Sequence, residues 1–139
     1  MILSNKIKAI VFDVSGVLLV DNKLDKRLLT IIKDLKQKGY LLFLATHLSK
    51  ESAEEFWIKY ELENIFGAYF TPDNMLGLSK SSIQFFKKIR KVIKIKLENI
   101  LMIDDIRSNV DTAIVAGWQG YHYMEFEKAE KELFKRLLY

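Results

Sequence analysis

The stretch Ala9-Ile10-Val11-Phe12-Asp13 decides the fold, because four apolar residues run directly into an aspartate. The same form returns twice: residues 40–45 lead into Thr46, and residues 99–103 lead into Asp104 and Asp105. Short apolar runs rich in β-branched residues are typical of strands buried in a parallel sheet. Segments with helical periodicity separate these runs, so the alternation predicts a three-layer α/β fold with helices on both faces of the sheet.

Residues typical of helix caps and helix ends set the bounds of the expected helices and strands. Gly39 should end the first helix and Ser49 should cap the second. Strands are expected at residues 9–12, 40–45, 68–70, 99–103 and 121–124, and helices at 25–38, 49–57, 108–116 and 127–138, with a further helix opening at Lys80. The pattern predicts a Rossmann-like parallel sheet of about five strands.

Length and composition exclude several classes of protein. With 139 residues, half of them hydrophobic, the chain can bury its own core, so one domain over residues 1–139 is expected. The absence of cysteine excludes disulfides, zinc–thiolate sites and cysteine nucleophiles. Residues 1–6 carry no leader pattern, and no apolar segment approaches the roughly 18 residues that a spanning helix needs. We therefore expect a cytoplasmic protein without a membrane partner.

The charge of the chain is modest and unevenly distributed. Lysine and arginine number 22 and acidic residues 18, and much of the excess of +4 lies between Lys87 and Lys96. A solvated helix face explains such a run more simply than a patch for nucleic acid or an acidic partner. A nucleic-acid partner is therefore less favoured than a solvated helix face as the explanation of this run.

The polar residues that follow the predicted strands form a constellation. Asp13, Thr46 and the pair Asp104-Asp105 each come directly after an apolar run. Because the carboxyl ends of parallel strands form the ligand crevice of an open α/β sheet, these side chains should meet although they are scattered in sequence.

These residues resemble the four signature motifs of the haloacid dehalogenase (HAD) superfamily, in the same order along the chain. The matching segments are Phe12-Asp13-Val14-Ser15-Gly16-Val17-Leu18, Leu44-Ala45-Thr46, Lys80 after Gly77-Leu78-Ser79, and Ile103-Asp104-Asp105 with Asn109 and Ala116-Gly117-Trp118. Each fragment is a weak signal alone, but the four together span essentially the whole chain. The resemblance implies a sheet order of 5-4-1-2-3 and a phosphohydrolase that uses Asp13 as its phosphate acceptor.

The resemblance also implies roles for the individual residues. Asp13 and Asp105 would bind Mg²⁺ directly together with the backbone carbonyl of Ser15, and Asp104 would hold a metal-bound water. Transfer of the phosphoryl group to Asp13 would split a difficult hydrolysis into two steps. The expected catalytic residues are Asp13, Ser15, Thr46 and Lys80, and the expected substrate-binding residues are Gly16, Thr46, His47, Lys80 and Asn109.

Ser15 departs from the family pattern. Phosphatases of this superfamily generally carry a second aspartate here, which protonates the leaving group and then activates water. A serine hydroxyl holds its proton too tightly for this role, and general acid–base catalysis typically contributes about 100- to 10,000-fold. Serine does occur in a branch that resembles phosphohistidine and pyrophosphate phosphatases. We therefore expect a substrate with a good leaving group, such as an acyl phosphate, a phosphoramidate or an aryl phosphate. His47 is an alternative proton donor, although an ordinary loop role is favoured.

The spacing of the motifs is the second departure. Asp13 and Thr46 lie roughly 33 residues apart, and Thr46 and Lys80 roughly 34, which one helical crossover nearly fills. The chain therefore resembles a subfamily I member whose cap domain is missing. An open site would admit a phosphorylated small molecule or macromolecule, or would be covered by a second subunit in a homo-oligomer.

Three other classes of protein compete with this interpretation. A receiver domain of two-component signalling has similar residues, but its acidic pair follows the first strand, whereas here the pair comes after the fourth. A catalytically weak or silent binding or regulatory module of the same fold would also tolerate Ser15. Dehalogenase chemistry uses the same aspartate without a metal, which the retained Asp104-Asp105 pair disfavours. Phosphotransfer from a long-lived aspartyl-phosphate is a further enzymatic alternative.

Overall fold

The computed structural model describes residues 6–139. The expectation on a leader pattern, drawn from residues 1–6, therefore lies outside the described residues except for Lys6. The strands are β1 (Ala9–Phe12), β2 (Leu19–Val20), β3 (Lys23–Leu24), β4 (Leu41–Ala45), β5 (Tyr69–Phe70), β6 (Ile100–Asp104) and β7 (Gln119–His122). The helices are α1 (Lys26–Lys38), α2 (Lys50–Lys59), α3 (Ile83–Ile93), α4 (Arg107–Val115), α5 (Phe126–Ala129) and α6 (Lys135–Leu138), with 3₁₀ turns at Leu62–Asn64 and Leu97–Asn99 and a π-helical segment at Glu130–Phe134 that joins α5 to α6.

The central sheet has five parallel strands in the order β5-β4-β1-β6-β7. With its strands numbered one to five along the chain, this order is the predicted 5-4-1-2-3. The labels differ because the sequence interpretation missed β2 and β3, which form a separate antiparallel ribbon. β1 lies at the centre of the sheet, so its carboxyl end is flanked by the ends of β4 and β6.

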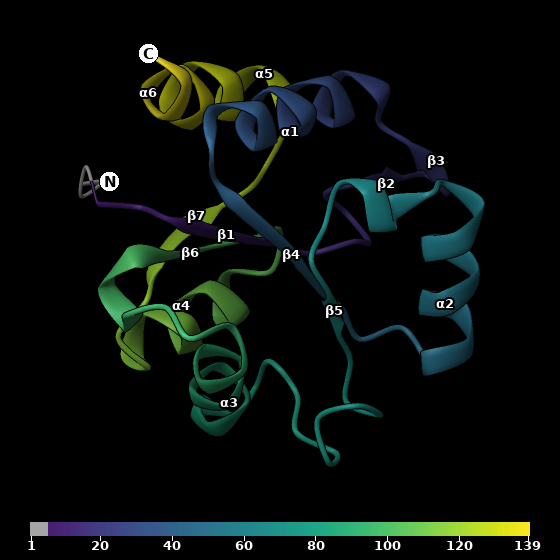
Figure 1. Ribbon diagram of the computed structural model, residues 1–139, viewed down its shortest axis with the longest axis vertical. Helices are drawn as coiled ribbons and strands as arrows, with labels where there is room; N and C mark the ends of the chain where they lie inside the picture. Colours follow the sequence, from purple (N-terminus) through teal and green to yellow (C-terminus); the bar gives the residue numbers. More distant parts are fainter. Residues whose placement is uncertain (1–5) are drawn as a thin grey trace.

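Helices cover both faces of the sheet (Figure 1). Ile10 and Phe12 of β1 pack into a core with α1, α2 and the C-terminal helix, whereas Ala9 and Val11 pack into a second core with α3 and α4. This alternation follows from the two-residue period of a strand, and both faces are apolar because both are covered. The predicted three-layer α/β architecture is confirmed.

The ribbon β2–β3 follows the loop after β1 and is closed by a two-residue turn. Asp21 and Asn22 both adopt positive φ, 53° and 60°, as a type I′ hairpin turn requires. No extra domain is inserted at this turn. Between Thr46 and Lys80 the chain holds only α2, one 3₁₀ turn, β5 and a loop, so neither interval contains a cap.

Two predicted boundaries need correction. Lys80 does not open a helix: it lies in the preceding turn, and α3 begins at Ile83 because the Ser82 side chain accepts a hydrogen bond from the Gln84 amide at 3.2 Å. The last strand begins at Gln119 rather than at residue 121. The N-cap of α2 at Ser49 and the end of α1 at Gly39 are confirmed.

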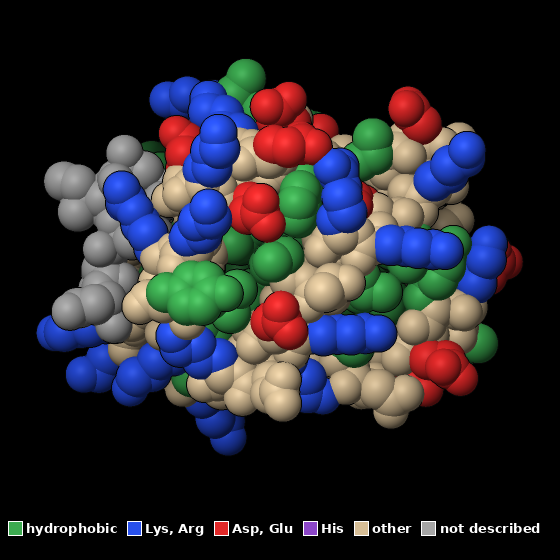
Figure 2. Space-filling model, turned by 90° about the horizontal axis from the view of Figure 1, so that it is seen from above, with side chains coloured by type: hydrophobic (Ala, Val, Ile, Leu, Met, Phe, Trp, Pro, Cys, Tyr) green, Lys and Arg blue, Asp and Glu red, His purple; other side chains and the backbone are tan. Residues whose placement is uncertain are grey.

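The lysine-rich stretch lies along the solvent side of α3 and the loop after it. Lys87, Lys91, Lys94 and Lys96 are exposed, while Phe85, Phe86 and Ile89 face the core. The opposite side of the molecule, seen from above α1 and the C-terminal helix, mixes basic and acidic side chains (Figure 2). Over residues 6–139, no helix is both long enough and apolar enough to cross a membrane.

Gly120 of β7 allows α4 to pack directly on the sheet, which makes a specific stability prediction. A Cβ at this position would lie 2.7 Å from Cγ1 of Val110 and 3.1 Å from Cγ1 of Ile114. Gly120→Ala should therefore lower the free energy of unfolding by about 1–3 kcal/mol, measured by urea denaturation. Val115→Ala, on the exposed side of the same helix, is the control and should change it by less than about 0.5 kcal/mol. Equal stability of the two variants would contradict this packing.

Candidate active site

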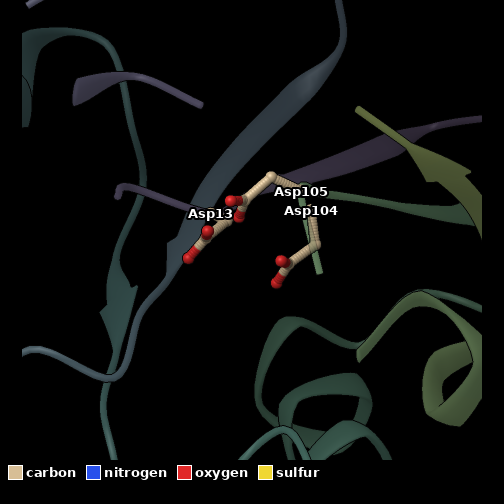
Figure 3. Close-up of side chains that lie close together, drawn as sticks. All are labelled: Asp13, Asp104 and Asp105. Atoms are coloured by element: carbon tan, nitrogen blue, oxygen red, sulfur yellow. The ribbon is translucent and has the colours of Figure 1, made fainter. Parts of the chain in front are cut away.

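The carboxyl ends of β1, β4 and β6 bring the predicted residues together. Asp13 directly follows β1, Thr46 follows β4, and β6 ends at Asp104 with Asp105 next in the chain. The carboxylates of Asp13, Asp104 and Asp105 each offer an oxygen, and these three atoms lie within 4.8 Å of one another (Figure 3). The predicted convergence of segments about ninety residues apart is thus present in the fold.

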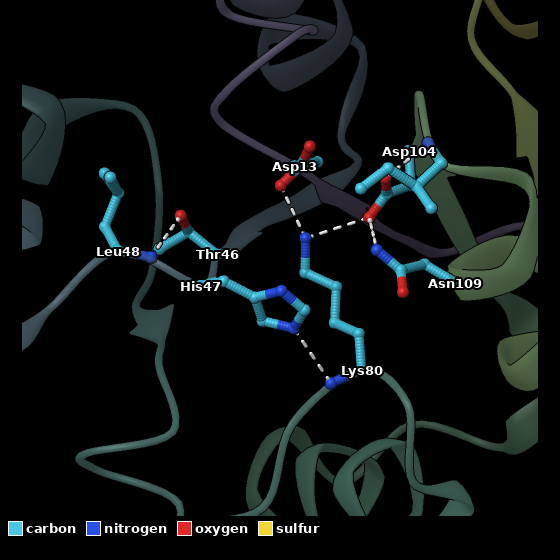
Figure 4. A network of polar contacts seen from close by, with 8 residues as sticks. Asp13, Thr46, His47, Leu48, Lys80, Asp104 and Asn109 are labelled. Carbon is cyan, nitrogen blue, oxygen red and sulfur yellow. Dashed lines mark hydrogen bonds and ion pairs between the residues drawn. The ribbon is translucent and has the colours of Figure 1, made fainter.

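Lys80 is the cation at the centre of this cluster. Its side chain is 1% exposed, and its ammonium donates hydrogen bonds to Oδ1 of Asp13 at 2.5 Å and to Oδ2 of Asp104 at 2.8 Å (Figure 4). A lysine is buried to this extent only when its charge is paired and hydrogen-bonded. Lys80 therefore joins the loop before α3 to the ends of β1 and β6.

Asp104 is completely buried and is surrounded by protein donors. Oδ2 accepts from Lys80 and also from Nδ2 of Asn109 at 3.2 Å, while Oδ1 accepts from the Ile106 amide at 2.9 Å. The bond from Ile106 satisfies one of the backbone amides at the start of α4 that have no partner within the helix. Asp104 thus orients Lys80 and anchors the loop that carries Asp105.

Asp105 has an oxygen with no protein partner. Oδ1 is buried and accepts no hydrogen bond from residues 6–139. Gly16 packs against this carboxylate: its φ is +85°, and a Cβ there would lie 2.1 Å from Oδ2 of Asp105. Only glycine combines this backbone conformation with so close an approach. The loop after β1 therefore fits directly over the Asp105 side chain.

A cavity of about 380 Å³ opens above the cluster. It is lined by Asp13, Ser15, Gly16, Thr46, His47, Leu48, Lys80, Asp105, Ile106 and Asn109. Every predicted site residue except the fully buried Asp104 contributes to its wall. The hydroxyl of Thr46 lies at the cavity and accepts from the Leu48 amide at 3.1 Å, which orders the loop between β4 and α2.

Three contributors were missed by the sequence interpretation. Leu48 and Ile106 line the cavity, and His122 donates from Nε2 to the backbone carbonyl of Asp105 at 2.9 Å, because a carbonyl can only accept. His122 is not among the site residues predicted from the sequence. No local pattern marks it, since the parallel pairing of β6 with β7 is what sets His122 beside Asp104.

The electrostatics of the site follow from its burial. Desolvation raises the pKa of Asp13 to about 7, and the nearby Asp104 charge adds to this rise, while the Lys80 ammonium opposes it. The pKa of His47 is lowered by burial and by the Lys80 charge. The imidazole Nε2 accepts from the Lys80 amide at 3.2 Å, so His47 is neutral at pH 7 and bonds to the loop that carries Lys80.

The donor set fits a hard divalent cation. One lysine cannot neutralise three carboxylates, and Asp105, which has an unpaired oxygen, belongs to the same group of three carboxylates as Asp13. Carboxylate oxygens are the ligands that Mg²⁺ and Ca²⁺ prefer. Asp13 and Asp105 are the residues available to hold such an ion, because Asp104 is engaged by Lys80, Asn109 and the Ile106 amide.

Comparison with known proteins agrees with this architecture. No protein-family model matches the sequence, and no curated protein matches it significantly. A hydrolase from Streptococcus pneumoniae TIGR4 aligns with a TM-score of 0.78 at 14% identity, over 92% of this chain and 98% of that one. A HAD family enzyme from Bacteroides thetaiotaomicron, solved with magnesium and inorganic phosphate, gives 0.68 at 15% identity, over 83% and 93%. A dehalogenase solved with an intermediate complex gives 0.75 at 10% identity, over 85% of each chain.

These likenesses define the fold of the chain. The protein has the fold of the HAD superfamily of hydrolases, with the cluster of Asp13, Lys80, Asp104 and Asp105 at the carboxyl edge of its sheet. The predicted family resemblance is confirmed at this level.

The raised pKa of Asp13 predicts the stability of the metal-free protein. The pKa of the Asp13 carboxyl is near 7 in the folded state, against a reference value of 3.8 for the unfolded chain, so folding favours its protonated form. The contribution of this group to the free energy of unfolding is therefore lost as pH rises from about 4 through 7. In EDTA at pH 8, Asp13→Asn should therefore be more stable than wild type by roughly 1–4 kcal/mol, and the difference should vanish near pH 4. Asn keeps the acceptor for Lys80.

Urea denaturation across this pH range measures the effect. Asp111→Asn is the matched control, because it also removes one carboxylate but from an exposed pair with Arg107. Parallel stability curves for wild type and Asp13→Asn would show that the Asp13 carboxylate is not destabilised by its surroundings.

Proposed function

We propose that the protein is a magnesium-dependent phosphohydrolase that works through an aspartyl-phosphate on Asp13. The observation that carries the proposal is the buried Asp13–Lys80–Asp104 network beside the unpaired oxygen of Asp105, at the floor of an open cavity. The neighbour solved with magnesium and inorganic phosphate supports it, because that protein has the same fold. Bound at Asp13 and Asp105, with the Ser15 carbonyl as a further ligand, Mg²⁺ would offset the charge of the phosphate.

The residues of the chain divide the reaction between them. The Asp13 carboxylate attacks phosphorus as the bond to the leaving oxygen breaks, and water then attacks the aspartyl-phosphate, releasing inorganic phosphate and restoring Asp13. Lys80 and the Thr46 hydroxyl bind non-bridging oxygens of the phosphate, and Gly16 lets nearby amides approach it. Asp104 keeps the Lys80 ammonium in place through both steps.

Among residues 6–139, the only carboxyls that line the cavity are Asp13 and Asp105, which the proposal assigns to the nucleophile and the metal, so no side chain is left as general acid and good leaving groups are favoured. Ser15 is exposed at the cavity and its hydroxyl cannot serve as a matched general acid at neutral pH. His47 does not replace it, because its imidazole is neutral with Nε2 bonded to the Lys80 amide. A neutral imidazole N–H is a far weaker acid than imidazolium. The leaving oxygen must therefore depart with little protonation.

The predictions on domain organisation, localisation and partners are also proposals. The chain is a single HAD-like core domain over residues 1–139, it acts in the cytoplasm without a membrane partner, and its open crevice admits a small or macromolecular phosphorylated substrate. Nucleic acid is the less favoured partner. In a homo-oligomer, a second copy of the chain would cover the crevice.

Hydrolysis of 4-nitrophenyl phosphate tests the proposal. Wild type should release phosphate with Mg²⁺ and lose this activity in EDTA, and Asp13→Asn should lower kcat by roughly 10⁴-fold or more because the nucleophile is gone. Asp111→Asn should keep wild-type activity. Turnover that survives in EDTA or in Asp13→Asn would contradict the mechanism. Magnesium-dependent phosphate binding without turnover would instead identify a silent binding module.

Replacing Ser15 tests the missing acid. Ser15→Asp supplies the carboxyl that the family pattern carries at this position, so it should raise the rate on an alkyl phosphate by about 100-fold or more, with a much smaller gain on 4-nitrophenyl phosphate. Ser15→Asn, which has the same size but no acidic proton, is the control and should give no such gain. Equal acceleration of both substrates, or of both variants, would count against the proposed role.

A further inference from the structure

The two acidic residues at the end of β6 are held in different ways. The Asp104 carboxylate accepts hydrogen bonds from three protein donors, so the protein alone fixes its orientation. The Asp105 carboxylate has an oxygen, Oδ1, that is buried and accepts no hydrogen bond within residues 6–139. The placement of the Asp105 side chain therefore depends more strongly on how its backbone is held.

A histidine from the neighbouring strand holds that backbone. Nε2 of His122 donates a hydrogen bond to the carbonyl of Asp105 at 2.9 Å. His122 is the last residue of β7, which pairs in parallel with β6 (Figure 1). The register sets His122 opposite Asp104, one residue before its acceptor. A side chain of one strand is thus bonded to the loop that leaves the next.

This bond belongs neither to the sheet nor to helix α4. The carbonyl of Asp104 accepts from the Tyr123 amide at 2.8 Å, a bond that any residue except proline could supply at position 123. The first backbone bonds of α4 go to the carbonyl of Ile106, its N-cap. The Asp105 carbonyl lies between these two regular patterns and takes its hydrogen bond from a side chain. The residue type at position 122 therefore matters as it would not at an ordinary strand position.

The loop after β1 restricts the same aspartate from its side-chain end. A Cβ on Gly16 would lie 2.1 Å from Oδ2 of Asp105, so the backbone of this loop fits against the carboxylate. The contact with Gly16 limits where the carboxylate lies, and the bond from His122 limits where the backbone that carries it lies. Mg²⁺ demands near-ideal octahedral geometry with short bonds to oxygen, so its affinity is sensitive to small displacements of a ligand.

We propose that His122 is a positioning residue of the metal site, whose hydrogen bond to the Asp105 carbonyl holds the Asp105 carboxylate where it binds Mg²⁺. The inference rests on the magnesium-dependent phosphohydrolase function proposed above. His122 does not line the catalytic cavity, so it acts through Asp105 and is not a catalytic residue. Hydrogen-bond partners that orient metal ligands typically contribute about 10- to 100-fold in metal affinity.

Replacement of the donor tests this role without substrate. His122→Phe keeps a planar ring and removes the N–H, so the Kd for Mg²⁺ alone should rise about tenfold in calorimetric titrations. His122→Gln places an amide N–H at nearly the same distance from the backbone as Nε2 and should restore most of the affinity. His122→Asn, whose amide is one carbon shorter, should bind Mg²⁺ as weakly as His122→Phe and gives the same comparison between two polar variants.

Gln119 supplies a matched control on the same strand. Its Nε2 donates to the Glu98 carbonyl at 2.6 Å, so it makes the same kind of bond as His122 but at the opposite end of β7. Gln119→Met removes this bond and should leave the Kd for Mg²⁺ unchanged. Urea denaturation in EDTA measures the free energy of unfolding of each variant, which a merely structural role of His122 would lower while the Kd for Mg²⁺ stays the same.

Kinetics with 4-nitrophenyl phosphate give a second readout. In His122→Phe the Mg²⁺ concentration for half-maximal rate should rise about tenfold, in line with the weaker binding of the ion. The kcat at saturating Mg²⁺ should stay close to that of wild type, because the residues that meet the substrate are unchanged.

The outcomes separate this inference from the function on which it rests. Wild-type affinity for Mg²⁺ in His122→Phe, an equal loss in Gln119→Met, or no recovery in His122→Gln would overturn the positioning role and leave the phosphohydrolase proposal standing. Failure of wild type to bind Mg²⁺ would overturn both. Mg²⁺ binding that depends on His122 in a protein without turnover would support the positioning role and contradict only the hydrolysis.

Discussion

The site depends on one buried interaction, the ammonium of Lys80 held between the carboxylates of Asp13 and Asp104. A lysine that is 1% exposed would be strongly unfavourable without these partners, and two adjacent carboxylates would repel each other without the lysine. The interaction links the ends of β1 and β6 to the loop before α3. Each partner is therefore oriented by the others, so Asp13, the proposed nucleophile, is positioned by the fold and not by its own rotamer alone.

The remaining negative charge explains why the site suits a cation. Three carboxylates face one lysine, and Oδ1 of Asp105 has no partner in the chain from residue 6 onward. Such an arrangement is costly for the fold alone and becomes favourable when a divalent ion is bound, because binding to the folded state stabilises it. The close approach of Gly16 to Asp105 holds the loop after β1 against this charge.

Most of the fold and much of the candidate site could be predicted from local patterns. Apolar runs that end at Asp13, Thr46 and Asp104 set the strands and their polar ends, because strand burial and strand termination are written in neighbouring residues. The ribbon β2–β3 was missed because two-residue strands carry too little periodicity to detect. The start of α3 was misplaced because Ser82, and not Lys80, supplies the cap.

By itself the sequence determined the class of fold, the order of the motifs and the residue types of the site, since these depend on side-chain chemistry and on short-range spacing. Only the tertiary structure decided that Lys80 is buried between two aspartates, that His47 is bonded to the Lys80 amide, and that His122 supports Asp105. The physical reason is that such contacts join segments distant in the chain, and their geometry is set by strand register and layer packing.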